Sequence, residues 1–197
     1  AEKLYEAVFD GVLSKLDLFS RYAGALDARK NRALRDGFSG IGIGFKHKAG
    51  VLHITNVISN TPASIAGLQS DDIITHINRK SVSHLTTRHV TDLIRNLSLK
   101  TISLTIIKAG LKTSETHNLT RKHIIYPTVT EKRLNDILYF KVSSFNQGTA
   151  RSLSEKLKTA ISEMGDALIG VVLDLRGNPG GLLKQSVKVA DLFLSQG

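Results

Sequence analysis

Residues 171–183 read VVLDLRGNPGGLL, and this stretch decides how the rest of the chain is interpreted. The apolar run before Asp174 predicts a buried strand, and the glycines after Asn178 predict a tight turn that leads into a helix. Such glycines leave backbone amides free at the start of the helix, a suitable place for a developing oxyanion. A plain strand-to-helix turn would be the interpretation of any shorter version of this stretch.

The elements around this stretch alternate between strands and long helices. The spacing of apolar residues predicts, in chain order, strands at 124–129 and 137–142, a helix at 149–164, a strand at 170–175 and a helix at 182–194. Strands that alternate with helices indicate a layered α/β core with parallel pairing.

Between residues 40 and 121 the chain consists of short β-rich runs separated by glycine, asparagine and serine turns. The pattern predicts strands at 41–45, 52–58, 73–78 and 102–108, a helical turn at 61–67 and a helix at 87–96. The inward side chains expected on that last helix are Val90, Leu93, Ile94 and Leu97. These elements indicate a small β-barrel or sandwich with two helices.

The string Gly40-Ile41-Gly42-Ile43-Gly44 opens the first of these strands. Successive glycines let backbone amides turn inward together and form an anion nest, and the strand edge that follows can pair with an extended peptide. A glycine-rich hairpin is the alternative interpretation. The string lacks the G-x-G-x-x-G spacing before a helix, so dinucleotide binding is disfavoured.

The first 39 residues predict a helical lead-in. Apolar residues in 2–18 fall on one face of a helix, and that face is expected to pack against another surface. A second helix is expected to run to Asp36, with Asp27 as its N-terminal cap and Gly37 as its left-handed stop.

The composition excludes several kinds of site. The chain has 197 residues, no cysteine and a formal net charge of +10. Without cysteine it forms no disulfide, thiolate zinc site or cysteine nucleophile, and its seven histidines lack metal-ligand spacing, so neither a metal nor a cofactor is expected. The excess positive charge follows no helical stripe and is interleaved with few aromatic residues, so nucleic acid is not expected as a partner.

The order of several short motifs resembles that of a PDZ domain, and more narrowly the PDZ domain of the C-terminal processing peptidases, or tail-specific proteases. The motifs are Gly40 to Ile43, Val57 to Ala63, Ala66-Gly67-Leu68, Asp72-Ile73-Ile74, Ile77-Asn78 and Val82. The sequence departs from the family pattern at Ser70 and at Asn78-Arg79, where the family commonly has glycine.

This resemblance implies a groove in which the nest holds the C-terminal carboxylate of a peptide while the strand pairs with the peptide backbone. The implied lining is Gly40, Ile41, Gly42 and Ile43 in the carboxylate loop, Phe45 on the pairing strand, and Thr87, Thr91 and Ile94 on the helix. An apolar peptide end would fit Ile41, Ile43 and Ile94 best. In the alternative interpretation Ile43, Val90 and Ile94 are only part of the domain core.

Residues 171–183 closely resemble the strand, Asn-Pro-Gly-Gly loop and helix of the same family's catalytic core, and the similarity extends over nearly the whole chain. It implies that the backbone amide of Gly180 or Gly181 donates to an oxyanion hole, and both glycines stay open as candidates. It also implies that Asp174, Arg176 and Asn178 hold the loop. Asp174 has an alternative role as a strand-end residue that only caps the turn.

The family cleaves peptides with a serine hydroxyl that a neutral lysine activates. In the family's order both residues follow the helix that we expect to end at Leu194, so we expect neither in this chain and expect the chain alone to be inactive. The sequence thus supports the N-terminal portion of a PDZ-containing serine endopeptidase that recognises C-terminal peptide ends. The alternative is a catalytically inactive peptide-binding or scaffolding module.

We therefore expect a mixed α/β chain with a helical lead-in at 1–39, a PDZ domain at 40–121 and the first part of an α/β peptidase core at 122–197. An incomplete core leaves a helix uncovered and strand edges unpaired, which predicts a homo-oligomer or a strand-exchanged dimer. The resemblance implies polypeptide substrates with apolar C-termini and a periplasmic or membrane-associated place in the bacterial envelope. The basic middle segment leaves acidic substrates and an anionic membrane surface open as partners.

Overall fold

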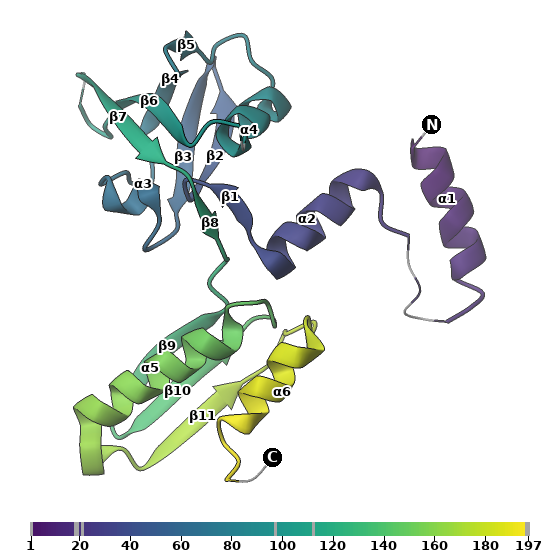
Figure 1. Ribbon diagram of the computed structural model, residues 1–197, viewed down its shortest axis with the longest axis vertical. Coiled ribbons are helices and arrows are strands. Elements are labelled where there is room, and N and C mark those ends of the chain that lie inside the picture. Colours follow the sequence, from purple (N-terminus) through teal and green to yellow (C-terminus); the bar gives the residue numbers. More distant parts are fainter. Residues whose placement is uncertain (1, 18–19, 21, 97, 112, 196–197) are drawn as a thin grey trace.

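The computed structural model describes residues 2–17, 20, 22–96, 98–111 and 113–195 (Figure 1). It has the mixed α/β architecture that the sequence predicts, with two separate clusters of buried apolar side chains. Leu97, which we expected to point inward from the helix at 87–96, lies outside the described residues. None of the helices in the described part of the chain is both long enough and apolar enough to cross a bilayer.

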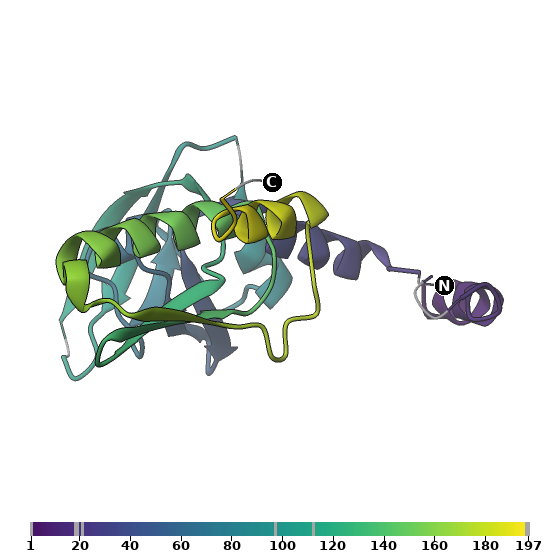
Figure 2. The same ribbon diagram turned by 90° about the horizontal axis from the view of Figure 1, so that it is seen from below.

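Two helices open the chain, α1 (Glu2–Leu13) and α2 (Ala25–Asp36), and α1 lies apart from the two folded regions (Figures 1 and 2). The apolar face that we expected on the first helix is not covered by the rest of the chain that the structure describes. Its exposed apolar side chains include Leu4, Tyr5, Val8, Phe9 and Val12. The ring of Phe9 stacks on that of Tyr22 with centroids 4.7 Å apart, which is the only aromatic pair of this segment among the described residues.

The start of α2 also differs from the sequence prediction. The helix begins at Ala25 with Gly24 as its N-cap, so Asp27 lies inside the first turn, where a carboxylate still favours the helix dipole. The predicted stop is confirmed, because Gly37 follows the helix with φ +86° and its amide donates to the carbonyl of Ala33.

The middle of the chain forms an antiparallel sheet with the strand order β2-β3-β4-β6-β7, and a short strand β5 pairs with β4. The strands are β2 (Ile43–Lys48), β3 (Val51–Val57), β4 (Ile73–Ile77), β5 (Lys80–Ser81), β6 (Thr101–Ile107) and β7 (Ser114–Thr120). Two helices accompany them, α3 (Pro62–Ile65) and α4 (Thr87–Arg95). The core of this sheet includes fully buried Leu52, Ile74, Leu104 and Ile106, to which α4 adds Val90.

A second, smaller ladder joins the lead-in to the rest of the chain. Strand β1 (Phe38–Gly40) pairs antiparallel with β8 (Lys122–Ile124), and Gly40 lies opposite Lys122. The strand that we expected at 124–129 is therefore wrong over most of its length. Pro127 lies between β8 and β9 (Val129–Leu134), where its missing N–H cannot interrupt a ladder.

The last part of the chain is a three-stranded sheet in the order β11-β10-β9 with helices on one face (Figure 2). Its elements are β10 (Ile137–Val142), α5 (Thr149–Met164), a 3-10 turn η1 (Gly165–Ala167), β11 (Gly170–Asp174) and α6 (Leu183–Asp191). The predicted parallel pairing holds for β10 and β11, which α5 connects, whereas β9 pairs antiparallel with β10. Leu138, Phe140 and Val142 alternate along β10 and are fully buried.

The turn between β4 and β5 takes an unusual conformation for its sequence. Ile77 pairs with Lys80, so Asn78 and Arg79 form a two-residue turn, with φ of +50° and +66°. This is the left-handed geometry that usually selects glycine in such hairpins. The backbone at Asn78 and Arg79 thus has the conformation of a glycine turn, although neither residue is glycine. Near the other departure, at Ser70, it is Asp71 that has a positive φ, of +70°.

Candidate functional site

The glycine loop between β1 and β2 has the backbone geometry of an anion nest. Gly42 has φ +89°, and a Cβ built on it would overlap the side chain of Thr61. Two hydrogen bonds to carbonyls of the loop hold it in place. The amide of Ile58 donates to the carbonyl of Gly42 at 2.8 Å, and the amide of Ala63 donates to the carbonyl of Ile41 at 2.9 Å. In the described part of the chain the amides of Ile41 and Gly42 donate no hydrogen bond, so the protein itself engages neither of them.

A pocket of about 200 Å³ lies beside this loop, between β2 and α4. It is lined by Phe38, Ile41, Gly42, Ile43, Gly44, Phe45, Thr91, Ile94, Arg95 and Tyr126. Most of the predicted groove residues thus meet in one place, but Gly40 and Thr87 do not line this pocket. Gly40 is held in the β1–β8 ladder, and Thr87 lines a neighbouring groove.

The apolar residues of the pocket also belong to the core, as the alternative interpretation held for some of them. Ile41 is fully buried and Ile94 nearly so, and both pack in the cluster of the middle sheet together with Val90. Ile43 is half-buried at the edge of that cluster. Ile43 and Ile94 therefore line the pocket as well as the core, whereas Val90 does not line the pocket and belongs to the core alone.

Four lining residues were absent from the predicted groove: Phe38, Gly44, Arg95 and Tyr126. The rings of Phe38 and Tyr126 lie 5.1 Å apart, and the guanidinium of Arg95 lies 5.0 Å from the centroid of the Phe38 ring. Phe38 stands directly before the glycine loop, which is a signal that could have indicated it. Tyr126 reaches the pocket only because β8 pairs with β1, and nothing in the local sequence indicates this.

The position of α4, the helical wall of the pocket, is fixed by a buried arginine. Arg121 donates to the carbonyls of Leu93 and Ile94, both at 2.8 Å, which are among the otherwise unpaired carbonyls of the last turn of α4. It also donates to the carbonyls of Leu99 at 2.5 Å and Thr101 at 2.6 Å. Burial lowers the pKa of this guanidinium from its ordinary value. One side chain therefore ties α4 to the start of β6.

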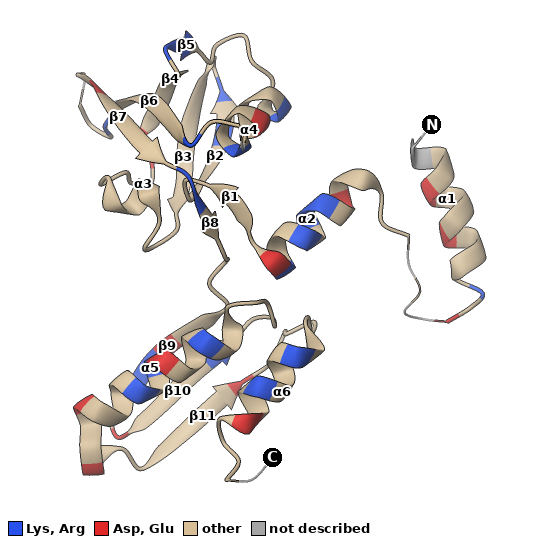
Figure 3. Ribbon diagram, viewed as in Figure 1, with Lys and Arg blue, Asp and Glu red and all other residues tan. Residues whose placement is uncertain are grey.

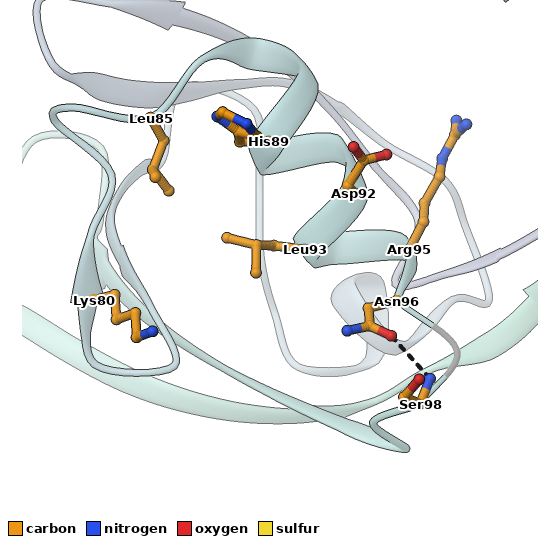
Figure 4. Close-up of a pocket in the computed structure, with 8 residues that line it drawn as sticks. All are labelled: Lys80, Leu85, His89, Asp92, Leu93, Arg95, Asn96 and Ser98. Atoms are coloured by element: carbon orange, nitrogen blue, oxygen red, sulfur yellow. Dashed lines mark hydrogen bonds between the residues drawn. The ribbon is translucent and has the colours of Figure 1, made fainter.

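A larger pocket, of about 820 Å³, lies on the other side of α4 (Figure 4). Its lining is Lys80, Leu85, His89, Asp92, Leu93, Arg95, Asn96 and Ser98, and the side chain of Asn96 accepts a hydrogen bond from the amide of Ser98 at 2.9 Å. No residue of the predicted groove lines it. Arg95 lines both this pocket and the pocket beside the glycine loop, but no residue of the loop lines this one.

The carboxylate of Asp174, at the end of β11, is the centre of the second predicted cluster. It accepts hydrogen bonds from the backbone amide and the guanidinium of Arg176, each at 2.9 Å, and from the hydroxyl of Tyr139. These donors, Arg176 first, hold the pKa of Asp174 well below its ordinary range, and the bond to Asp174 raises the pKa of Tyr139. Asp174 thus accepts from the amide of Arg176, as a turn cap does, and also pairs with the side chain of Arg176.

Asn178 and the two glycines after it differ in how their amides are used. The side chain of Asn178 donates to the carbonyl of Val142 at 3.0 Å and accepts from the amide of Gly180 at 2.7 Å. Gly181 has φ +145°, and a Cβ there would overlap the backbone of Phe145. Among the described residues the Gly181 amide donates no hydrogen bond, whereas the Gly180 amide is already occupied.

The chain matches two protein families. Residues 136–197 match Peptidase family S41, and residues 28–107 match the PDZ domain. The "Carboxy-terminal-processing protease" of Bartonella bacilliformis is 34% identical over 201 aligned residues, which cover 100% of this chain and 46% of that protein. The "Carboxy-terminal processing protease CtpA" of Bacillus subtilis is 30% identical over 199 residues, covering 100% of this chain and 42% of that protein. The chain thus spans less than half the length of both relatives.

Among solved structures, the photosystem II D1 C-terminal processing protease has a similar fold. The match has a TM-score of 0.50 and 21% sequence identity, and it covers 94% of this chain and 52% of that one. At this identity the likeness concerns the fold alone.

Proposed function

Because the chain belongs to the PDZ-containing carboxy-terminal processing proteases of peptidase family S41, we propose that it is the peptide-recognising portion of a serine endopeptidase. In this proposal the middle sheet binds the C-terminal end of a polypeptide, and the last sheet contributes part of the site that cleaves it. The domain limits of 40–121 and 122–197 belong to the same proposal.

One observation carries the binding half of the proposal: two unengaged amides, at Ile41 and Gly42, lie beside a pocket with apolar walls. A terminal carboxylate accepts hydrogen bonds from such amides, and charge-assisted bonds of this kind are the strong ones. An apolar last side chain fits against Ile43 and Ile94, and the peptide backbone extends β2 along its free edge.

The catalytic half rests on the loop at 178–181. Attack of a serine hydroxyl on a peptide carbonyl places negative charge on the carbonyl oxygen while a neutral lysine takes the hydroxyl proton. The free amide of Gly181 supports this residue, rather than Gly180, as the donor to that oxyanion. Asp174, Arg176 and Asn178 act as positioning residues, because their bonds fix the turn from which the amide projects.

We assign the serine and the lysine to neither sheet of this chain, so residues 1–197 bind peptides without cleaving them. The resemblance supports this assignment, because in the family's order both residues follow the helix that corresponds to α6. The alternative function, an inactive binding module, differs from the peptidase in one measurable property, hydrolysis of a peptide. Hydrolysis by the native polypeptide that contains this chain supports the peptidase, and its absence supports the module.

Binding is tested with a labelled peptide that has an apolar last residue, as the free acid and as the C-terminal amide. We expect the amide to bind about 10- to 100-fold more weakly, because it loses charge-assisted bonds to the loop. Gly42→Ala should abolish binding, since its Cβ overlaps Thr61. Gly170→Ala is the control, because that glycine lies outside the pocket with open space around it. Equal affinity for acid and amide would contradict the proposal.

The exposed apolar surface of the last sheet supports self-association as a further part of the proposal. Strand β11 has a free edge, and Val172 on it and Val187 on α6 are 44% and 60% exposed. Sedimentation velocity should show a fraction of dimer that increases with protein concentration, and Val172→Lys should shift the protein to monomer. A monomer at every concentration would contradict this.

We place the intact protein at the bacterial envelope, which cell fractionation tests.

A further inference from the structure

A second groove, of about 740 Å³, lies between α2 and α4. It adjoins the pocket of about 200 Å³ beside the glycine loop, here called the peptide pocket. The two share four lining residues, Phe38, Thr91, Arg95 and Tyr126, so they form one continuous depression. Helix α2 is thus a third wall beside a peptide held between β2 and α4. Leu26 and Leu34 on α2 and the ring of Phe38 give this groove an apolar lining.

The groove has a strong excess of positive charge. Its lining includes Arg29, Lys30 and Arg32 from α2 and Arg88 and Arg95 from α4, and the acidic residue among its lining residues is Asp92. Figure 3 shows these basic segments on the two helices. None of the five cations forms an ion pair with a residue that the structure describes. Arg95 lies over the ring of Phe38, and Arg35 together with the charge of Arg32 lowers the pKa of Asp36, so a ligand in the groove shares Arg95 and Arg32 with these neighbours.

The geometry of α4 indicates which part of a peptide would reach these cations. In the last turn, Ile94 and Arg95 line the peptide pocket. In the first turn, Thr87 and Arg88 line only the second groove. A peptide with its carboxylate at the glycine loop therefore runs from the last turn of α4 toward the first. Eight residue steps of about 1.5 Å give about 12 Å of helix, the span of about three to four extended residues.

We propose that the groove between α2 and α4 selects peptides that carry Asp or Glu two to four residues before an apolar C-terminal residue. This inference rests on the proposed function, because it needs a peptide seated at the glycine loop. An anionic membrane surface is the less suitable partner, because the cations line a depression with an apolar lining that continues into the peptide pocket. A flat bilayer would meet only its rim.

The test compares two free-acid peptides that differ only by Glu or Gln at the third and fourth positions from the C-terminus. At low ionic strength we expect the Glu peptide to bind the chain on the order of fivefold more tightly, the effect of two partly exposed ion pairs. The difference should vanish at high salt, because screening acts on exposed charges. Fluorescence anisotropy measures both dissociation constants.

Variants locate the effect. Arg29→Gln combined with Arg32→Gln should remove the preference for Glu and leave the affinity for the Gln peptide unchanged. The matched control is Arg151→Gln combined with Lys158→Gln on α5, which removes the same charge from exposed positions outside the groove. Circular dichroism checks that both pairs of variants fold as the parent does.

The outcomes separate this inference from the proposed function. If both peptides bind equally well but still need a free carboxylate, the charge selection is wrong and the proposed function stands. If neither peptide binds, the proposed function itself fails. If the Arg29/Arg32 variant loses binding to phosphatidylserine vesicles while its preference for Glu persists, the cations serve a membrane, and the inference is overturned.

Discussion

The middle sheet and the last sheet of the molecule differ in how completely their apolar faces are covered. On β6 of the middle sheet, Leu104 and Ile106 are fully buried. On β11 of the last sheet, Val171 and Val172 are 36% and 44% exposed. The middle sheet is closed by its own helices and turns, whereas the last sheet is one open layer with two helices on one face. Burial therefore supports an independently stable middle region and a last region that depends on further contacts.

The largest expected effect comes from truncating the core of the last sheet. Phe140 lies on the central strand β10 and is fully buried, so Phe140→Ala should cost about 4 kcal/mol of stability. We expect it to unfold the last region, from β9 to α6, and leave the middle sheet folded. Amide hydrogen exchange read by mass spectrometry should show protection lost only there.

Leu104→Ala on β6 is the matched truncation in the middle sheet, with an expected cost of about 3 kcal/mol. It should lower protection in the middle sheet without affecting β10. If either variant erases protection in both sheets together, the two regions unfold as one unit and the comparison between them does not hold.

The next effect concerns the support of α4 in the middle sheet. Arg121→Met removes donors from four carbonyls, and we expect a loss of about 3 kcal/mol together with weaker peptide binding, because Ile94 shifts with the end of α4. Chemical denaturation and anisotropy measure the two effects. Lys122→Met, at the exposed neighbour, should change neither, and an equal loss there would point to a general effect of removing charge.

A smaller effect on stability is expected at low pH. It concerns one carboxylate at each sheet: Asp72, which directly precedes β4, and Asp174, which ends β11. Burial opposes ionisation of Asp72, but the amide of Gln69, Lys108 at 3.0 Å and the amide of Ala109 outweigh it and lower the pKa of Asp72. Asp174 has a lowered pKa for the reasons given above. Each carboxylate binds a proton more weakly in the folded state than in the unfolded state. Its contribution to the free energy of unfolding is therefore present above its unfolded pKa of about 3.9 and is lost as pH falls below that value toward the folded pKa.

Asn variants assign this acid sensitivity to each sheet. Between pH 6 and pH 3 hydrogen exchange should show the middle sheet losing less protection in Asp72→Asn, and the loop at 174–181 losing less in Asp174→Asn, than in the parent. At neutral pH each variant should be the less stable protein, since it lacks the charged bonds. Parent-like acid sensitivity in both variants would show that other carboxylates govern it.

Much of the fold was predictable because it depends on local pattern. The helix at 149–164 agrees with α5 at both ends, since its apolar spacing and its flanking glycines are local signals. Strand β7 escaped prediction because its sequence, SETHNLT, is polar, and only Leu119 of it is buried. A strand at the end of a sheet needs few apolar residues, so periodicity does not reveal it.

The candidate site divides in the same way. The backbone conformations of Gly42 and Gly181 require glycine, so these positions stand out in the sequence. Tyr126 and the wall formed by α2 do not, because the β1–β8 ladder and tertiary packing bring them to the pocket. Sequence indicated the two glycine loops but left Gly180 and Gly181 both open, and only the fold indicated which amide is unengaged and which side chains surround each loop.

The smallest expected effect compares one hairpin turn in each sheet. Arg79 has φ +66° in the β4–β5 turn, where a β-carbon is strained, so Arg79→Gly should raise stability by about 0.5 kcal/mol after the entropy cost of glycine in the unfolded chain. Asn135 has φ +54° in the β9–β10 turn, yet Asn135→Gly should gain almost nothing, because asparagine tolerates the left-handed region. Thermal unfolding measures both, and Arg79→Ala, which keeps the β-carbon, should leave stability near that of the parent. A gain from Arg79→Ala equal to that from glycine would mean that the charge of Arg79, and not its backbone conformation, destabilises the turn.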